Sequence, residues 1–146
     1  MEKFEIIKKN KKDFLDLLLI GDEQESMIYK YLERGELFAL YGDELIAASV
    51  VTDEGNGVFE IKNISVCPKF QRQGYGTKFI KYLIDFYKDK FTMMLVGTGG
   101  DTVNFYQKCG FTISHRIENF FTDNYDHPIF ENGKQLKDMI YLKLTQ

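Results

Sequence analysis

The stretch 66-VCPKFQRQGYGTKFIKYL-83 joins the end of an apolar segment to an amphipathic one. From Thr77 to about Lys88 the apolar residues recur at helical spacing on one face, which predicts a helix. Gly74 and Gly76 lie in the polar turn just before it. A glycine turn at a helix N-terminus offers unpaired backbone N–H groups and the positive end of the helix dipole, which together bind phosphate. The stretch therefore predicts a phosphate-binding turn, and a glycine turn without a ligand is the alternative.

Two familiar phosphate-binding motifs do not fit this turn. The dinucleotide fingerprint G-x-G-x-x-G requires a third glycine where this chain has Phe79, which is too large for close packing of helix and strand. The Walker loop G-x-x-x-x-G-K-[ST] requires glycine where this chain has Gln71, and lysine where it has Thr77.

The elements on either side of the turn predict a mixed sheet. Glycine turns near residues 42–43 and 54–57 connect short apolar runs and predict an antiparallel meander. A strand, a helix and another strand over residues 58–97 require a parallel crossover. We therefore expect an α/β (α+β) fold with about seven, mostly antiparallel strands and helices on both faces. The expected strands are 3–9, 36–42, 44–53, 58–66, 91–98, 111–121 and 136–144; the expected helices are 11–34, 77–88 and 99–110.

Caps and breaks complete this prediction. The first helical stretch is expected to break near Gly21, with Asp22 as the N-cap of a second helix. Asp101 is expected to cap the helix that Gly110 ends. The loop at 122–135 is predicted to have no regular structure.

Length and composition favour a single domain over residues 1–146. The chain is 44% hydrophobic and 28% charged and has only two prolines, which is typical of a packed globule. Its formal charge of −3 and pI near 5.4 argue against broad nucleic-acid binding and favour a cationic partner over an anionic one. No segment resembles a signal peptide or approaches the roughly 20 apolar residues of a spanning helix, so we expect a cytoplasmic protein without a membrane partner.

The cysteines and histidines do not predict a metal or a nucleophilic site. Cys67, Cys109, His115 and His127 show none of the close pair spacings of a zinc site, so no metal is expected. Cys67 lies near the glycine turn, but no activating His or Lys is close to it in sequence. We interpret both cysteines as small buried side chains.

Two motifs together resemble the GNAT acetyltransferase family. The opening stretch is similar to that family's acetyl-CoA signature, in which V-x-P is followed by Q/R-x-x-G-x-G/A, and 101-DTVNFYQKCGF-111 is similar to its later helix with a Phe-Tyr pair. The end of the chain resembles a bacterial branch of generic acetyltransferases. The resemblance implies a GNAT fold with a splayed parallel strand pair, acetyl-CoA as co-substrate, and direct acetyl transfer to a primary amine of a small molecule or peptide. It is compatible with a monomer or a homodimer.

The resemblance also implies which residues hold the coenzyme. Backbone amides of the turn would bind the pyrophosphate; the turn residues are Gln71, Arg72, Gln73, Gly74, Tyr75, Gly76 and Thr77. The main chain of Ile64, Ser65 and Val66 would bind the pantetheine arm as if it were another strand. Many members have Asn where this chain has Gly99, so that contact is either lost or taken over by Asn104. Arg72 either adds charge or is an exposed loop residue.

Glu60 and Tyr106 are the candidate catalytic residues. Glu60 lies eleven residues before Gln71, the offset of the general base in the histone-acetylating branch, and strand alternation would put it on one face with Lys62, Ile64 and Val66. The alternative is a solvated glutamate paired with Lys62. Tyr106 matches the tyrosine that donates a proton to the leaving thiolate, and otherwise it is a packed helix residue. A backbone N–H near Val66 would stabilise the developing oxyanion.

Acidic and aromatic residues are the candidates for the surroundings of the acceptor. Acidic residues of the first helices and of the late loop are candidates for attracting a cationic amine: Asp22, Glu23, Glu25, Asp123, Asp126 and Glu131. The aromatic run Phe120, Phe121, Tyr125 and Phe130 is interpreted as core or dimer contact rather than a substrate pocket. A module that binds acyl-CoA without turnover is the alternative to an enzyme.

Overall fold

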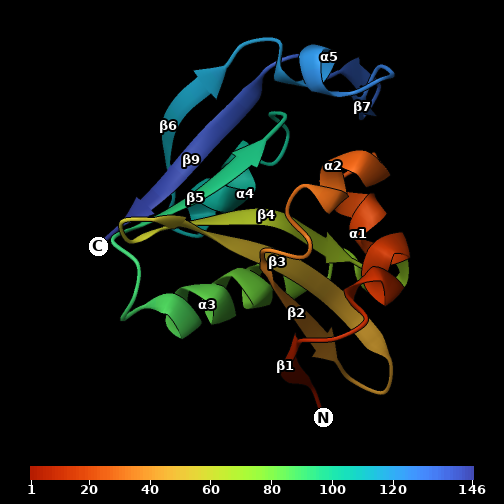
Figure 1. The fold of residues 1–146 in the computed structure, drawn as a ribbon, viewed down its shortest axis with the longest axis vertical. Coiled ribbons are helices and arrows are strands. Elements are labelled where there is room, and N and C mark those ends of the chain that lie inside the picture. Colours follow the sequence, from red (N-terminus) through yellow and green to blue (C-terminus); the bar gives the residue numbers. More distant parts are fainter.

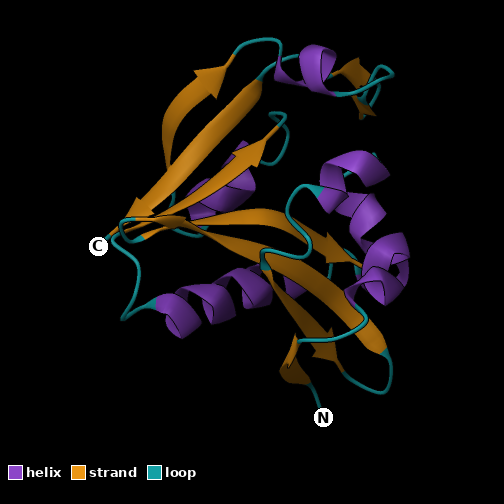
Figure 2. Ribbon diagram, viewed as in Figure 1, coloured by secondary structure: helices purple, strands orange, loops and turns teal.

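The computed structural model describes residues 1–146 as a seven-stranded sheet with helices on both faces (Figures 1 and 2). The strand order is β1-β2-β3-β4-β5-β9-β6, and the β4–β5 pair is the parallel one. This confirms the predicted mixed, mostly antiparallel sheet. The strands are β1 (Lys3–Ile7), β2 (Glu36–Tyr41), β3 (Leu45–Gly55), β4 (Val58–Val66), β5 (Met93–Thr98), β6 (Thr112–Ile117) and β9 (Met139–Thr145).

Each face of the sheet has its own hydrophobic core. On one face, α3 (Tyr75–Tyr87) and α4 (Val103–Lys108) pack over a cluster that includes Phe79, Ile80 and Tyr106. On the other face, α1 (Leu15–Gly21) and α2 (Glu25–Tyr29) cover a smaller cluster around Leu18 and Ile28. The spacing of the apolar residues predicted one apolar face on α3. Of its five residues, Phe86 is half-buried and the others are buried: Phe79, Ile80, Leu83 and Tyr87. No helix is long and apolar enough to cross a membrane.

The middle strand β4 carries two departures from regular pairing. It pairs with β5 only over Val58–Ile61, opposite 93–96 of β5, and then runs on to Val66 beside β3 alone. The two parallel strands are therefore splayed beyond Ile61. Lys62 has no partner on β3, because Ile61 pairs with Val51 and Asn63 with Val50, which is a β-bulge.

The bulge corrects the predicted face of Glu60. Across it the side-chain alternation shifts by one residue, so Glu60 and Ile64 lie on opposite faces of the sheet. Ile64 and Val66 pack against the core under α3, whereas Glu60 pairs with Thr52 on the other face. Strand alternation alone could not predict this, because an extra residue in one strand leaves no mark in the apolar pattern.

The segment after β6 contains structure that the sequence did not predict. Residues 118–138, here named the capping segment, include α5 (Phe120–Asn124) and a small hairpin of β7 (Phe130–Glu131) and β8 (Lys134–Gln135). The predicted strand 111–121 ends early, because Asn119 adopts a left-handed conformation at the start of α5. Figure 1 shows α5 and β7 reaching from the β6–β9 edge towards α2.

Both predicted N-caps are wrong. Gln24, not Asp22, precedes α2, and Asp22 instead ends α1. Thr102, not Asp101, precedes α4, and the Asp101 carboxylate accepts a hydrogen bond from Asn132 of the capping segment. In both places the carboxylate has a long-range partner: Tyr125 for Asp22 and Asn132 for Asp101.

Several short segments complete the chain. One-turn helices lie at Lys11–Phe14 and at Pro68–Phe70, the latter between β4 and the glycine turn. Lys11 donates hydrogen bonds to the carbonyls of Leu32, Glu33 and Gly35, and so satisfies backbone groups of the turn between α2 and β2.

Candidate functional site

Two adjoining cavities of about 510 Å³ each lie at the splayed ends of β4 and β5. Both are within the size range of small-molecule sites. The first, named the turn cavity, follows the glycine turn and the N-terminus of α3. The second, named the inner cavity, lies among β4, β5, the α1–α2 loop and the capping segment. Six residues line both, and the cavities therefore meet there: Ile20, Gly21, Ile64, Gln71, Thr102 and Tyr106.

The backbone of the turn has the shape of an anion-binding site. Arg72 has φ of 62° and Gly74 has φ of 85°, so two left-handed residues alternate with right-handed or extended ones. Such alternation turns successive N–H groups towards one concavity. A side chain at position 74 would meet no other atom, because nothing lies within 4 Å of the position where a Cβ would be. The left-handed φ, and not a lack of space, therefore favours glycine there. No side chain caps the N-terminus of α3, which leaves its first amides available to a ligand.

The side chains of the turn hold its shape. The Gln71 side chain donates to the Val66 carbonyl at 3.0 Å, and the Gln73 side chain donates to the Lys69 carbonyl at 3.1 Å. The Tyr75 hydroxyl donates to Glu2 at 2.6 Å, which ties the turn to the start of the chain. These hydrogen bonds are made by side chains, so they hold the turn in place and leave its backbone N–H groups available.

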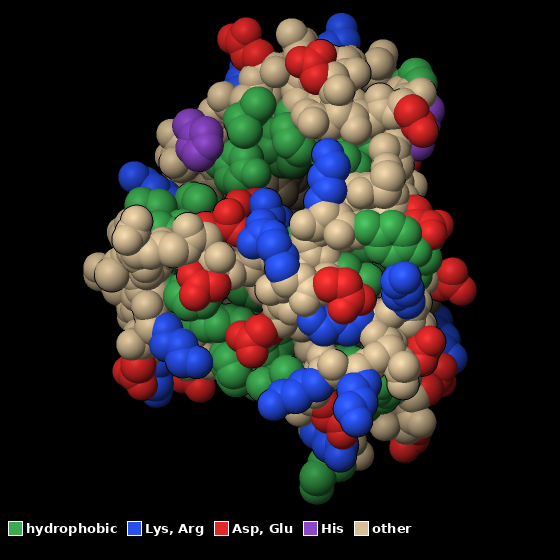
Figure 3. Space-filling model, in the orientation of Figure 1, with side chains coloured by type: hydrophobic (Ala, Val, Ile, Leu, Met, Phe, Trp, Pro, Cys, Tyr) green, Lys and Arg blue, Asp and Glu red, His purple; other side chains and the backbone are tan.

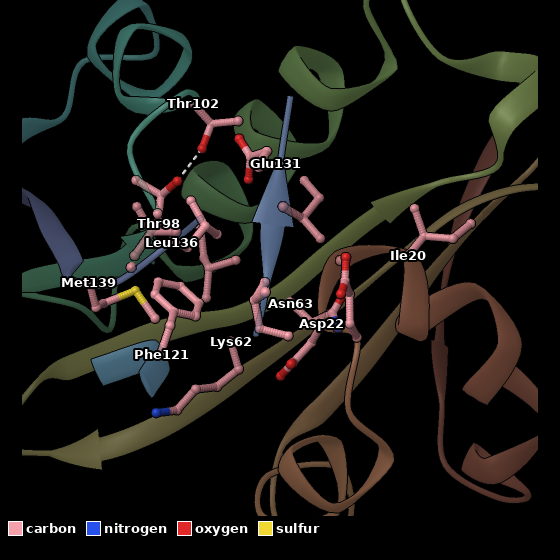
Figure 4. A pocket seen from close by; sticks show the side chains of 18 of the residues that line it. Ile20, Asp22, Lys62, Asn63, Thr98, Thr102, Phe121, Glu131, Leu136 and Met139 are labelled. Carbon is pink, nitrogen blue, oxygen red and sulfur yellow. Dashed lines mark hydrogen bonds between the residues drawn. The ribbon is translucent and has the colours of Figure 1, made fainter. Parts of the chain in front are cut away.

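All but three of the predicted site residues line one of the two cavities; the exceptions are Glu60, Gln73 and Asn104. Asn104 is exposed on α4. The space that an Asn side chain would take at position 99 is filled by Leu136 of the capping segment, which would lie 2.5 Å from a Cβ on Gly99. The residue before α4 that does line both cavities is Thr102, which is hydrogen-bonded to Thr98 (Figure 4).

Tyr106 lies where the two cavities meet. It is the only tyrosine that lines both, and it is 6% exposed. Its ring packs against Phe105 and Phe111, which fixes its position at the base of α4. The Tyr106 hydroxyl has no hydrogen-bond partner in the chain. Every fully buried side-chain oxygen or nitrogen does have a partner, so this hydroxyl is not fully buried and opens into the cavity. Burial, followed by the nearby Cys109 and Glu131, raises the pKa of this phenol, which keeps it protonated.

Glu60 lies behind the cavity wall. Its carboxylate forms an ion pair with Lys62 at 3.0 Å and accepts a hydrogen bond from Tyr141 at 3.1 Å. Lys62, unlike Glu60, lines the inner cavity. The structure thus contains the ion pair with Lys62 that the sequence offered as the alternative to catalysis, but Glu60 is buried and not solvated.

The inner cavity combines aromatic walls with carboxylates. Phe121, Tyr125 and Phe130 of the capping segment line it, although the sequence interpreted this aromatic run as core or dimer contacts. Phe121 is also a buried core residue, whereas Phe130 is exposed. Three of the six acids proposed to attract a cation also line it: Asp22, Glu23 and Glu131. Burial and the nearby Asp101 and Glu23 raise the pKa of Glu131. The surface hollow below the capping segment, with interspersed charges around it, is visible in Figure 3.

Cys67 has the features of an unreactive thiol. Its sulfur contacts the Leu45 carbonyl at 3.3 Å, and burial and the neighbouring Glu44 raise the pKa of the thiol. A thiol with a raised pKa carries little thiolate at neutral pH, and the thiolate is the reactive form.

Sequence reasoning found the acids Asp22, Glu23 and Glu131 of the inner cavity but missed the apolar residues that the capping segment brings to it, and the position of Lys62 in its wall. Leu136 and Ile129 carry no chemical signal, and Lys62 was treated only as a partner of Glu60. Only Gly97 and Gly99 could have indicated these contacts, because a glycine on or after a strand leaves space for a side chain from another segment. Here the side chains come from residues that follow the β7–β8 hairpin. Met139 and Leu136 fill those two spaces.

Comparisons with known proteins agree with this geometry. Residues 5–111 match the family model described as "Acetyltransferase (GNAT) family". An uncharacterized N-acetyltransferase of Bacillus subtilis strain 168, YvbK, is 35% identical over 147 residues, covering 97% of this chain and 95% of that protein. A GNAT family acetyltransferase from Elizabethkingia anophelis, solved with acetyl-CoA bound, is 37% identical with a TM-score of 0.93, covering 99% of this chain and 98% of that one. A Bacillus subtilis acetyltransferase solved with CoA is 34% identical with a TM-score of 0.90, covering 100% and 99%.

Proposed function

The chain belongs to the GNAT acetyltransferase family, and we propose that it transfers an acetyl group from acetyl-CoA to a primary amine of a small molecule or peptide. The transfer is direct, within a complex that contains both substrates. One observation carries this proposal: two cavities lie at the splayed ends of β4 and β5, and Tyr106 is among the residues where they meet. Acetyl-CoA occupies the turn cavity and the amine occupies the inner cavity.

The residues of the turn cavity fit coenzyme A. The left-handed conformations at Arg72 and Gly74 and the uncapped start of α3 suit a diphosphate. Beyond Ile61 the edge of β4 that faces away from β3 has no strand beside it. The main-chain groups of Ile64, Ser65 and Val66 that face this edge can hydrogen-bond an extended pantetheine arm, except the Val66 carbonyl, which accepts from Gln71. The relatives solved with acetyl-CoA and CoA support this assignment.

The chemistry requires proton transfers at both the amine and the leaving thiol. The acceptor ammonium first gives one proton to a base, because only the neutral amine has the lone pair that attacks. The amine nitrogen then forms a bond to the thioester carbonyl carbon, the C–S bond breaks, and the nitrogen loses its second proton to the base or to solvent. The leaving thiolate takes a proton from the Tyr106 hydroxyl, and the phenolate that this leaves is reprotonated from solvent. Tyr106 is suited to this role because its hydroxyl is protonated, free of protein partners and open to the cavity. The backbone N–H near Val66 is the candidate donor to the carbonyl oxygen.

Glu60 remains the candidate base, and a variant tests it. We expect Glu60→Gln to lower kcat and to shift the alkaline rise of kcat/KM with pH, since an amide cannot take up the proton. The matched control is Glu54→Gln, which changes an ion-paired glutamate of β3 that lines neither cavity. An unaltered pH profile in Glu60→Gln would assign the Glu60–Lys62 pair a purely structural role.

Release of free CoA thiol from acetyl-CoA tests the function itself. A panel of primary amines, from hexylamine to a lysine-containing peptide, should include acceptors that raise thiol release above the rate of hydrolysis. Each product should gain one acetyl group by mass spectrometry. Tight binding of CoA with no turnover on any amine would contradict the proposal and favour a binding module.

A further inference from the structure

Asp22 is held beside the strand that the proposed function assigns to the pantetheine arm. Gly21 packs so closely on β4 that a Cβ there would lie 2.6 Å from the Ser65 Oγ, 2.8 Å from the Asn63 Oδ1 and 3.1 Å from the Ile64 carbonyl oxygen. Gly21 also lines both cavities. The next residue, Asp22, is therefore fixed close to the point where the cavities meet, and it lines the inner cavity (Figure 4).

The Asp22 carboxylate is oriented by two tyrosines from different parts of the chain. One oxygen accepts a hydrogen bond from Tyr31 at 3.0 Å, and the other accepts one from Tyr125 of the capping segment at 2.6 Å. Tyr31 is itself fixed by Asn63 of β4, which donates to its hydroxyl at 3.1 Å. A second bond between the same two regions runs from the Asp126 backbone N–H to the Gln24 side chain at 3.0 Å.

These hydrogen bonds do not fully offset the cost of burying the charge of the Asp22 carboxylate. Burial raises its pKa, and the hydrogen bonds from Tyr125, Tyr31 and the backbone of Gln24, together with the charge of Lys30, only partly offset this. No salt bridge reaches Asp22: Lys62, the basic residue of the cavity lining, is paired with Glu60. A carboxylate accepts about four hydrogen bonds, so the two tyrosines and the Gln24 backbone leave one position open.

We infer that Asp22 binds the ammonium group of the acceptor amine, and that Tyr31 and Tyr125 hold its carboxylate in position to do so. This rests on the proposed function and adds the group that recognises the acceptor. A cation is the ligand that a half-buried carboxylate without a basic partner favours most strongly. Because Tyr125 belongs to the capping segment, the same bond ties that segment over the inner cavity.

Removing the charge of Asp22 should change the KM for the amine without lowering the thermal stability of the protein. We expect Asp22→Asn to raise KM for a cationic amine by at least about 10-fold, since a hydrogen bond to a charged partner is lost. KM for acetyl-CoA should change little. An Asp whose pKa is higher in the folded state than in the unfolded chain costs stability above both pKa values. The neutral Asn should therefore leave Tm at pH 7 unchanged or raise it.

The measurement uses hexylamine as the probe, together with the best acceptor of the panel. Thiol-release kinetics give both KM values for wild type, Asp22→Asn and the control Asp123→Asn, which changes an exposed aspartate of α5 outside the cavity. A second readout needs no turnover: with CoA present, hexylamine should raise the Tm of wild type more than its uncharged analogue 1-hexanol does. Asp22→Asn should abolish that difference, and Asp123→Asn should keep it.

The outcomes distinguish this inference from its premise. If wild type acetylates amines while Asp22→Asn shows the same KM and the same difference between hexylamine and hexanol, the inference is overturned and the enzyme stands. If no amine in the panel is acetylated or stabilises wild type, the proposed function fails, and recognition by Asp22 fails with it. A lower Tm in Asp22→Asn with equal losses for hexylamine and hexanol would also overturn it, because that pattern indicates a structural residue.

Discussion

Tyr106→Phe is expected to lower kcat by about 100- to 10,000-fold, the usual contribution of a general acid or base. The variant removes only a hydroxyl that has no partner in the chain, and the ring keeps its contacts with Phe105 and Phe111. The fold and the affinity for CoA should therefore be retained. Thiol-release kinetics measure the first effect, and calorimetric titration with CoA measures the second.

The matched control for Tyr106 is Tyr29→Phe, which removes an exposed hydroxyl bound to Glu25 on α2, away from both cavities. It should change neither kcat nor CoA affinity. A Tyr106→Phe enzyme with wild-type kcat would remove this residue from the chemistry and leave it as a packing residue of α4. A parallel loss of CoA affinity would indicate a binding role instead.

Gly74→Val is expected to weaken CoA binding by about 10- to 100-fold. A β-branched residue is strained at φ of 85°, at a cost of about 1 to 3 kcal/mol, so the turn must either keep the strain or change shape and lose its inward-facing amides. Titration of the variant with CoA measures the change in Kd, and thermal unfolding measures the strain.

Gly55→Val is the matched control, because it introduces the same backbone strain at a turn that is not proposed to bind a ligand. Gly55 has φ of 90° in the β3–β4 hairpin, with nothing within 4 Å of its Cβ position, as at Gly74. Both variants should lower Tm by similar amounts, but only Gly74→Val should weaken CoA binding. Equal CoA affinity in the two variants would show that the turn does not hold the coenzyme.

Elements made by local patterns were predictable from the sequence. β4 was predicted at residues 58–66, the bounds that the structure has, because Asn56 between two glycines marks the preceding turn and Pro68 follows. The helix after the glycine turn was predicted within two residues at its start. The family follows from two short motifs whose spacing is fixed by local backbone geometry.

Features made by distant segments were not predictable in the same way. Asp22 and Tyr125 are separated by 103 residues, and only the folded capping segment brings them together. The bulge at Lys62 changes the face of Glu60 without changing the apolar pattern of β4. Gly99 suggested a lost coenzyme contact, but its space is taken by Leu136, which no local rule connects to it.

The most direct measurement is a calorimetric titration of wild type and Gly74→Val with CoA and with pantetheine, which lacks the diphosphate and the nucleotide. Wild type should bind CoA at least about 100-fold more tightly than pantetheine, since several charge-assisted hydrogen bonds are at stake. Gly74→Val should weaken CoA binding and leave pantetheine binding nearly unchanged. Equal wild-type affinities for the two ligands, or no binding of CoA, would contradict the claim that the turn at residues 71–77 binds the diphosphate.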